Sequence, residues 1–487
     1  MNSPLRRLSI VMLAMFVLLM GNASWVQYGQ AGALNDDPRN VRTIYREYGQ
    51  DRGPIVVAGT PVAFSEPVDD PFGFQRIYAN GPLYAPVTGH FSVVFSSTGI
   101  EDKGNAVLNG TDSSLLFQRI QQLFTGGSQQ GGAVEVTIDP AAQQAAWDLL
   151  GDQRGAVVAL DPKTGAILAM VSKPSYDPNV LAGHSTSEVN AAWQQLLEDP
   201  TDPMINRTIA GDLYAPGSTF KLVDTAMLLE SGDFTPDSEV PAPTVYTPPG
   251  TSTGIRNPGG AVCGNGTTAT LTEALRVSCN TPFAQLAVQL GPEALQDQAQ
   301  AFGFGQDLAI PMTVTPSTLG SDFDANDPAL AQTAIGQRSV RVTPMQMAMV
   351  VASIANGGVL MHPYLVATER GPNLDVVAET QPSVFSRPVS ASTASLMTQM
   401  MVNVVDNGTG WPGQVPGVSV AGKTGTAQSG VEGVAPTAWF TAFAPADDPQ
   451  IAIAVVVEEG GDLGDEATGA RVAAPIAAGV IEAVLGE

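Results

Sequence analysis

The sequence has few of the groups that hold metals or bind nucleic acid. Its 487 residues include only two cysteines and three scattered histidines, too few for a zinc site or for a small protein dense in disulfides. The 22 lysines and arginines face 47 aspartates and glutamates and form no basic cluster, which argues against a nucleic-acid partner. We therefore expect no nucleic-acid partner and no structural metal.

Charged residues are also scarce, at 14% of the chain, whereas hydrophobic residues make up 44%. This balance excludes a mainly disordered protein. At roughly 100 to 200 residues per domain, the length predicts two to four domains, or one large domain plus an appendage.

The amino terminus predicts a membrane anchor. Arg6 and Arg7 precede an uncharged, mostly apolar run, residues 8–26, which is close to the roughly 20 residues that cross a bilayer as a helix. Because basic residues stay on the cytoplasmic side, residues 1–29 would form a cytoplasmic stub and a single span, with the remaining chain outside. A cleaved signal peptide is the alternative, since small residues follow a short apolar run at positions 21–23.

The exported part divides at a glycine-rich stretch. Residues 30–130 contain short β-type runs, such as 55–57 and 91–95, and predict a small irregular β-rich domain. The segment 126–132 is the clearest linker, because glycine and small polar residues cannot drive packing. Beyond it, residues 131–487 place strands near both ends, at 155–171 and 439–457, around a helical middle. This order predicts a single α+β domain with an antiparallel sheet.

Ser218 and Lys221 have the spacing of a nucleophile and its base. They lie where a Pro-Gly pair precedes a helical run that ends near residue 230. Residues i and i+3 share a helix face, and a serine hydroxyl becomes a nucleophile when a neutral base takes its proton. Burial, the helix dipole and a second cation would each favour a neutral Lys221. The alternative is a surface lysine one turn after a helix-capping serine.

Two further motifs contain chemically useful side chains. Lys423, Thr424, Gly425 and Thr426 follow a β-type run at 418–420. On a strand edge, the glycine would let an extended peptide approach, and the cation and hydroxyls would suit its terminal carboxylate. A plain Lys-Thr-Gly turn is the alternative.

The second of these motifs is Ser278-Cys279-Asn280, after a helical stretch at 272–277. On its own it indicates an ordinary helix end, as an asparagine in this position does in most proteins.

Taken together and in this order, the three motifs resemble those of the penicillin-recognising serine enzymes, which share Ser-x-x-Lys, Ser-x-Asn and Lys-Thr-Gly. The resemblance covers roughly residue 130 to the end and includes the hairpin at 155–170. Ahead of it, the segments 52–55, 76–78 and 88–89 resemble the non-catalytic pedestal, or dimerisation-like domain, of class B penicillin-binding proteins. The short actinobacterial members of that class are the most similar.

The resemblance implies a peptidoglycan D,D-transpeptidase with a serine β-lactamase-like fold. Ser218 would attack the D-alanyl-D-alanine end of a stem peptide, Lys221 would take its proton, and Ser278 would pass a proton to the leaving D-alanine. Asn280 would orient Lys221 and the substrate, Lys423 would set the local field, and Thr424 and Thr426 would hold the carboxylate beside Gly425. The resemblance also implies no metal and no organic cofactor. Implied partners are β-lactam antibiotics as covalent inhibitors and other cell-wall enzymes, such as a glycosyltransferase.

Three other functions remain open at this stage. A β-lactamase would need an extra carboxylate to activate water, and no segment convincingly supplies it. A D,D-carboxypeptidase differs only in its acceptor. A non-enzymatic division scaffold would explain the anchor and pedestal, yet it has no use for a serine-lysine pair.

The two cysteines predict a disulfide. Cys263 and Cys279 lie in the exported region, where disulfides persist, and a bond between them would hold the Ser278 motif against the preceding loop. Two buried free thiols are the alternative, because spacing alone cannot show that the Cβ atoms approach each other.

Overall fold

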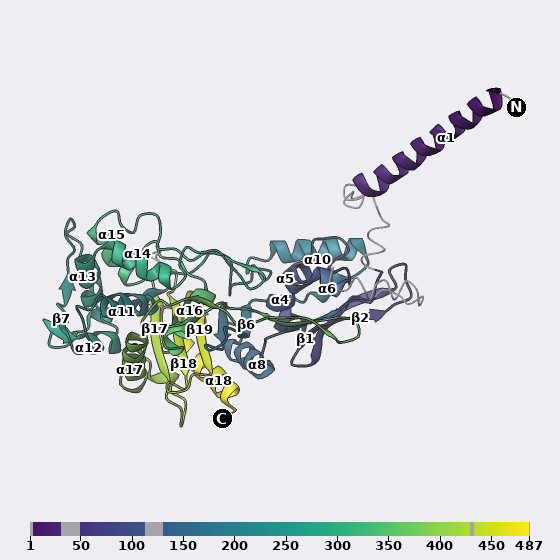
Figure 1. The fold of residues 1–487 in the computed structure, drawn as a ribbon. Coiled ribbons are helices and arrows are strands. Elements are labelled where there is room, and N and C mark those ends of the chain that lie inside the picture. The colour runs from purple at the N-terminus through teal and green to yellow at the C-terminus, as the bar shows by residue number, and fades with distance from the viewer. Residues whose placement is uncertain (1–2, 31–48, 113–129, 429–432, 487) are drawn as a thin grey trace.

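The structure is a computed structural model that describes residues 3–30, 49–112, 130–428 and 433–486. It begins with helix α1 (Ser3–Ser24), which continues into a short π-helix, η1 (Trp25–Gly29). Every residue of this helix is exposed, and Figure 1 shows it extending away from the rest of the molecule. Within the described ranges, Ser3–Gly29 is the one helix long and apolar enough to cross a membrane.

A six-stranded sheet, which we call the pedestal sheet, forms the amino-terminal domain, in the order β15-β14-β4-β1-β2-β3. Its strands are β1 (Ile55–Val57), β2 (Thr60–Pro67), β3 (Phe74–Tyr78), β4 (Ala133–Val136), β14 (Val366–Arg370) and β15 (Val376–Glu379). Strands β1 and β4 are parallel, and all other neighbours are antiparallel. The sheet therefore takes three strands from beyond residue 130, where the sequence placed a domain boundary.

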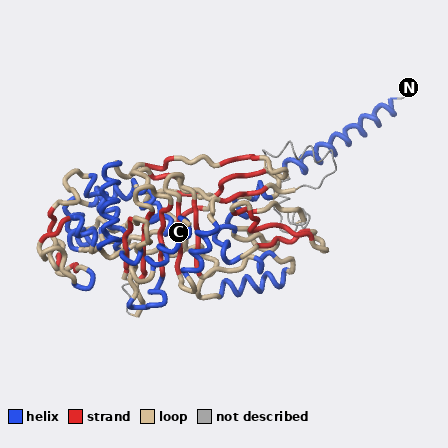
Figure 2. The backbone as a smooth tube through the Cα atoms, turned by 90° about the horizontal axis from the view of Figure 1, so that it is seen from below, coloured by secondary structure: helices blue, strands red, loops and turns tan. Residues whose placement is uncertain are grey.

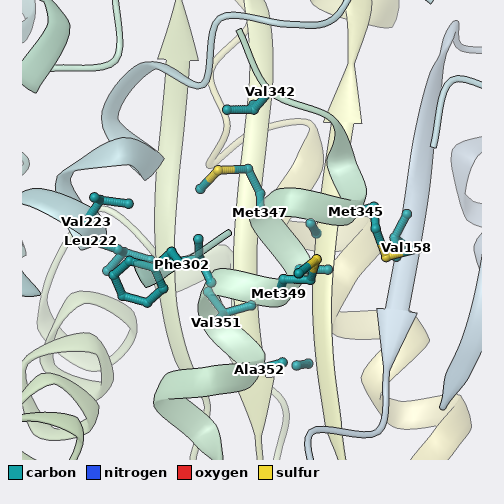
Figure 3. Close-up of a cluster of buried hydrophobic side chains, with 14 of the residues drawn as sticks. Val158, Leu222, Val223, Phe302, Val342, Met345, Met347, Met349, Val351 and Ala352 are labelled. Atoms are coloured by element: carbon teal, nitrogen blue, oxygen red, sulfur yellow. The ribbon is translucent and has the colours of Figure 1, made fainter. Parts of the chain in front are cut away.

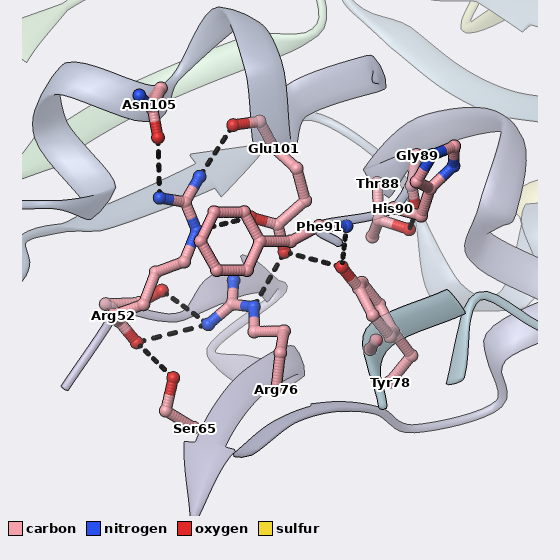
Figure 4. Close-up of polar contacts among 12 residues, drawn as sticks. Arg52, Ser65, Arg76, Tyr78, Thr88, Gly89, His90, Phe91, Glu101 and Asn105 are labelled. Carbon is pink, nitrogen blue, oxygen red and sulfur yellow. Dashed lines mark hydrogen bonds and ion pairs between the residues drawn. The ribbon is translucent and has the colours of Figure 1, made fainter. Parts of the chain in front are cut away.

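Two arginines from separate sequence segments meet in this domain on one buried carboxylate (Figure 4). Arg52 and Arg76 each form an ion pair with Glu101, at 2.6 and 2.7 Å, and Tyr78 donates a hydrogen bond to the same side chain. Burial raises the pKa of Glu101, but the two guanidinium groups outweigh it and the net shift is downward. The segments that resemble the pedestal of class B proteins thus form its polar centre, beside helices α4 (Gly81–Thr88), α5 (Gly99–Lys103) and α6 (Asn105–Leu108).

The strand predicted at residues 91–95 is wrong. The segment has no strand partner, because its backbone groups bond to side chains instead: Phe91 N–H donates to the Tyr78 hydroxyl, and Val94 N–H donates to Ser92 Oγ. The ring of Phe91 stacks under the Arg52 guanidinium at 4.1 Å. Phe91 therefore contacts the polar centre of the pedestal, whereas Phe95 stacks on Trp193.

The described end of the predicted glycine-rich linker is not a loose linker. Residues 126–129 lie outside the described part of the chain. Gly131 and Gly132 are packed rather than loose, since their N–H groups donate to Asp51 O and Val107 O. A Cβ at Gly131 would lie 1.8 Å from Leu108 O, so this glycine permits a close backbone approach.

The second domain is built on a five-stranded antiparallel sheet, in the order β17-β18-β19-β5-β6. The strands are β5 (Gly155–Leu160), β6 (Ile167–Lys173), β17 (Ala421–Ala427), β18 (Thr437–Ala444) and β19 (Ile451–Val457). Figure 2 shows these strands in the middle of the molecule, between the pedestal and a helical end. Strands from both ends of the domain thus meet in one sheet, as the sequence predicted.

Helices cover both faces of this sheet. In β5, Val157 and Ala159 join the cluster under α8 (Pro140–Leu150) and α18 (Ala473–Leu485), whereas Ala156 and Val158 face the larger core. Side chains alternate between faces along a strand, so a strand covered on both sides is apolar throughout. This explains the unbroken hydrophobic run of the hairpin.

The larger core is organised around α16 (Pro344–Ala355), whose side chains are almost all buried. Figure 3 shows Met345, Met347 and Met349 of this helix between Val158 of the sheet and Phe302 of the helical region. Helices α9 (Asn179–Ala182) and α10 (Thr186–Glu198) lie at the pedestal end, where Figure 1 shows α10 beside α4 and α5. The helical region holds α11 (Lys221–Glu230), α12 (Leu271–Arg276), α13 (Thr281–Leu290), α14 (Pro292–Ala301), α15 (Asp327–Ala334) and α17 (Ala391–Asn407). Short two-stranded ribbons complete it: β7 (Glu239–Pro241) with β10 (Thr268–Thr270), β8 (Val245–Tyr246) with β9 (Ile255–Arg256), β11 (Leu308–Ala309) with β12 (Thr313–Val314), and β13 (Leu360–Met361) with β16 (Val384–Ser386).

Candidate active site

Ser218 and Lys221 lie at the start of the first helix of the site. Ser218 is in a 3-10 turn, η3 (Gly217–Phe220), and Lys221 is the first residue of α11. One turn of spacing brings Lys221 Nζ to 3.0 Å from Ser218 Oγ. Lys221 is 0% exposed, which excludes the alternative of a surface lysine.

The Ser278 motif lies in the turn between α12 and α13. Ser278 has a φ of 60°, which is uncommon for a residue other than glycine and points to a functional constraint. Lys221 Nζ donates to the Ser278 carbonyl and to Asn280 Oδ1, at 2.8 Å each, and lies 3.4 Å from Ser278 Oγ. The amide of Asn280 is oriented by its Nδ2, which donates to Arg256 O.

Lys423 reaches the same serine from the sheet. It lies on β17, the edge strand of the sheet, and its Nζ donates to Ser278 Oγ at 2.8 Å and to Thr424 O at 2.9 Å. The motif is itself strand, whereas the run 418–420 before it is loop. A Cβ at Gly425 would lie 2.8 Å from Pro216 O, so this glycine lets β17 pack directly on η3.

Burial lowers the pKa of both lysines, and the charge of Lys423 also lowers that of Lys221. The pKa of Lys221 is well below its usual range, because of burial first and the neighbouring Lys423 second, with Asp224 acting in the opposite direction. Burial lowers the pKa of Lys423 to about 7. Asp224 is itself fully buried, and burial raises its pKa well above the usual value. In the described part of the chain, neither lysine forms an ion pair.

The predicted disulfide between Cys263 and Cys279 is present, with Cα atoms 6.1 Å apart. Both cysteines are buried. Because Cys279 is the middle residue of the Ser278 motif, the bond fixes that turn to the preceding loop.

The remaining motif residues line the edge of the sheet. The Thr424 hydroxyl lies 2.9 Å from that of Thr409, and the Thr426 hydroxyl accepts a hydrogen bond from Gly469 N–H. All three motifs therefore meet at the β17 edge of the sheet. They contribute the eight proposed site residues, of which Gly425 is the spacer.

Sequence reasoning missed two residues that support this site. Asn257 Oδ1 accepts from the N–H groups of Asn280 and Thr281, which are orphan donors at the start of α13. Its position in a Gly- and Pro-rich loop has no local signal of that role. Thr409 follows α17 in a Gly-Thr-Gly turn just ahead of β17, and this nearness to the third motif could have suggested it.

The arrangement can perform acyl transfer. It combines a hydroxyl, a buried amine of lowered pKa and a second hydroxyl that contacts two amines, all beside an open strand edge. In the described residues, no group of three or more His, Cys, Asp or Glu side chains could hold a metal ion.

Two protein families match the chain. Residues 155–482 match the family described as the penicillin binding protein transpeptidase domain, and residues 52–134 match the penicillin binding protein A dimerisation domain. The chain is 45% identical over 495 residues to peptidoglycan D,D-transpeptidase PbpA of Mycolicibacterium smegmatis, covering 100% of both chains. It is 44% identical to PbpA of Mycobacterium tuberculosis, over 100% of this chain and 99% of the relative.

A solved structure of penicillin-binding protein A from M. tuberculosis, a ceftriaxone acyl-enzyme complex, superposes with a TM-score of 0.87 at 43% identity. It covers 91% of this chain and 100% of its own.

Proposed function

The chain belongs to the penicillin-binding protein transpeptidase family, and we propose that it is a peptidoglycan D,D-transpeptidase that acts through an acyl-enzyme on Ser218. The substrate is the D-alanyl-D-alanine end of a stem peptide, and β-lactam antibiotics acylate the same serine. The observation that carries this proposal is the set of contacts around the Lys221 amine.

That set of contacts suits a neutral lysine. A neutral amine has two hydrogens and one lone pair, and two of its neighbours, Ser278 O and Asn280 Oδ1, can only accept. With both hydrogens so used, the lone pair is left for Ser218 Oγ at 3.0 Å. Lys221 then takes the Ser218 proton as the hydroxyl attacks the penultimate carbonyl.

Proton delivery to the leaving D-alanine falls to Ser278. Its hydroxyl lies within hydrogen-bond reach of both lysines, so it connects the protonated Lys221 with the far side of the site. Lys423 supplies positive charge there, and Asn280 keeps Lys221 in place.

The sheet edge binds the rest of the substrate. Thr424 and Thr426 hold the terminal carboxylate, and Gly425 lets the peptide backbone lie against β17. The N–H groups of Ser218 and Thr426 form the oxyanion hole, supported by the close packing of η3 on β17, where a Cβ at Gly217 would lie 2.7 Å from Thr426 O. An amine of a neighbouring stem peptide then accepts the acyl group.

The membrane arrangement follows from the same function. The helix Ser3–Gly29 anchors the protein, and the pedestal, which includes β4, β14 and β15 from beyond residue 130, adjoins a transpeptidase domain outside the cytoplasm. The flanking Arg6 and Arg7 and the disulfide support this orientation. Other cell-wall enzymes, such as a glycosyltransferase, are the expected partners.

Incubation of the detergent-solubilised full chain with polymerised cell-wall precursors tests the function. We expect cross-linked stem-peptide dimers, absent when penicillin is added first. Trimmed monomers alone would indicate a carboxypeptidase. Fluorescent penicillin should stay on the protein for many minutes, and its release within seconds would indicate a β-lactamase.

A further inference from the structure

We propose that Thr409 is a positioning residue for carboxylate recognition, acting through the hydroxyl of Thr424. This inference rests on the proposed function, in which Thr424 binds the substrate carboxylate. Thr409 belongs to none of the three motifs, and it lies 15 positions before Thr424 in sequence. Its hydroxyl nevertheless lies 2.9 Å from that of Thr424.

Two hydrogen bonds to Arg276 fix the backbone around Thr409. Thr409 N–H donates to Arg276 O at 3.2 Å, and the Arg276 guanidinium donates back to Asn407 O. A Cβ at Gly408 would lie 2.4 Å from the same Arg276 carbonyl, so the turn approaches as closely as glycine allows. Arg276 ends α12, two residues before Ser278. The turn therefore joins the second motif to the third.

The direction of the hydrogen bond between the two hydroxyls matters for binding. Each threonine hydroxyl has one hydrogen, so Thr424 can donate to a ligand only if it does not donate to Thr409. When a carboxylate occupies the site, Thr409 donates to Thr424 Oγ1, and the Thr424 hydrogen points to the ligand. Without the Thr409 hydroxyl, Thr424 loses this orientation and a buried lone pair loses its donor.

Among the described residues, Thr409 is the one side-chain partner of the Thr424 hydroxyl. The Thr424 carbonyl is occupied separately, because it accepts from Lys423 Nζ. The Lys423 amine is thus oriented by the Thr424 carbonyl, whereas the Thr424 hydroxyl is oriented by Thr409. Loss of the Thr409 hydroxyl should therefore weaken carboxylate binding. The nucleophile Ser218 and its base Lys221 should remain intact.

Acylation kinetics with two matched ligands test the proposal. The full chain is reacted with benzylpenicillin and with its uncharged methyl ester, and binding and acylation steps are separated by rapid mixing. We expect Thr409→Val to lower the second-order rate constant for the acid about three- to tenfold, the range set by one hydrogen bond, through weaker binding. The rate constant for the ester should stay within about twofold. Thr409→Ser, which keeps the hydroxyl, should restore the preference for the acid.

Thr398→Val is the matched control, because among the described residues the Thr398 hydroxyl bonds only to Ala394 O within α17. An equal loss on acid and ester, or no loss on either, would overturn the proposal, as would a Ser variant that behaves like Val. Should Thr409→Val fail to fold, Thr409→Ala gives the same comparison. Failure of the wild-type protein to react with either ligand would instead refute the proposed function.

Discussion

The amine of Lys423 lies 2.8 Å from the hydroxyl of Ser278. Lys221 approaches the same oxygen from the helix side, at 3.4 Å. Two buried lysines therefore share one hydroxyl, and the charge on Lys423 is one of the causes that lower the pKa of Lys221. The second and third motifs thus control the base of the first.

Replacement of Ser218 by alanine should abolish covalent labelling by fluorescent penicillin while leaving the fold intact, because it removes one hydroxyl and no buried apolar group. Labelling on a denaturing gel and the melting temperature measure the two effects. Ser231→Ala, at the far end of α11, should label normally, since its hydroxyl bonds only to the local backbone. Normal labelling of the Ser218 variant would disprove the assignment of the nucleophile.

The two lysines should differ in what they contribute. Lys221→Ala should block acylation almost completely, because no other base contacts Ser218 among the described residues. Lys423→Ala should weaken binding and slow acylation by about 10- to 100-fold, since it removes a charge-assisted contact rather than the base. The surface variant Lys163→Ala, which loses only an exposed pair with Asp448, is the control. Labelling that survived the Lys221 change would require another base.

The acylation rate should rise with pH as Lys221 loses its proton, because only the neutral amine can act as a base. Lys423→Ala removes a positive neighbour that lowers the Lys221 pKa, so the rising limb should move to higher pH. Second-order rate constants measured from about pH 5 to pH 9 give the position of this limb. An unmoved limb would show that the two amines do not interact.

The buried Lys423 should cost stability near neutral pH. Its folded pKa of about 7 lies below the ordinary unfolded value, so the unfolded state binds more protons between the two and wild-type stability rises with pH across this window. Lys423→Met lacks this cost, and we expect its melting temperature to exceed that of wild type by about 2 to 5 °C at neutral pH. The gap should shrink towards pH 10. A constant gap would mean that packing, not protonation, causes the difference.

Reduction of the Cys263–Cys279 bond should lower the melting temperature and slow acylation without abolishing it. Closing a loop of this length is worth about 3 kcal/mol in the chain-entropy model, and neither cysteine takes part in the chemistry. Thiol counting on unfolded, unreduced protein should find no free thiol. A reduced protein that melts and acylates like the oxidised one would show that the bond does not support the Ser278 turn.

The local sequence determined much of this protein. The hairpin of β5 and β6, the strand β19 and the helix α18 follow from apolar runs bounded by turns, because side-chain periodicity is a short-range property. The spacing of Ser218 and Lys221 likewise predicted a contact, since one helical turn brings them together.

Only the tertiary structure decided which distant segments meet. Lys423 reaches Ser278 across 145 positions, and Asn257 and Thr409 contribute to the site through bonds that leave no local pattern. The β-type segment 91–95 is a loop in which Phe91 N–H donates to Tyr78 and Val94 N–H donates to Ser92. Strands β14 and β15 joined a sheet far from them in sequence. The lowered pKa values of Lys221 and Lys423 also required the fold, because burial and the approach of the two charges exist only after packing excludes water.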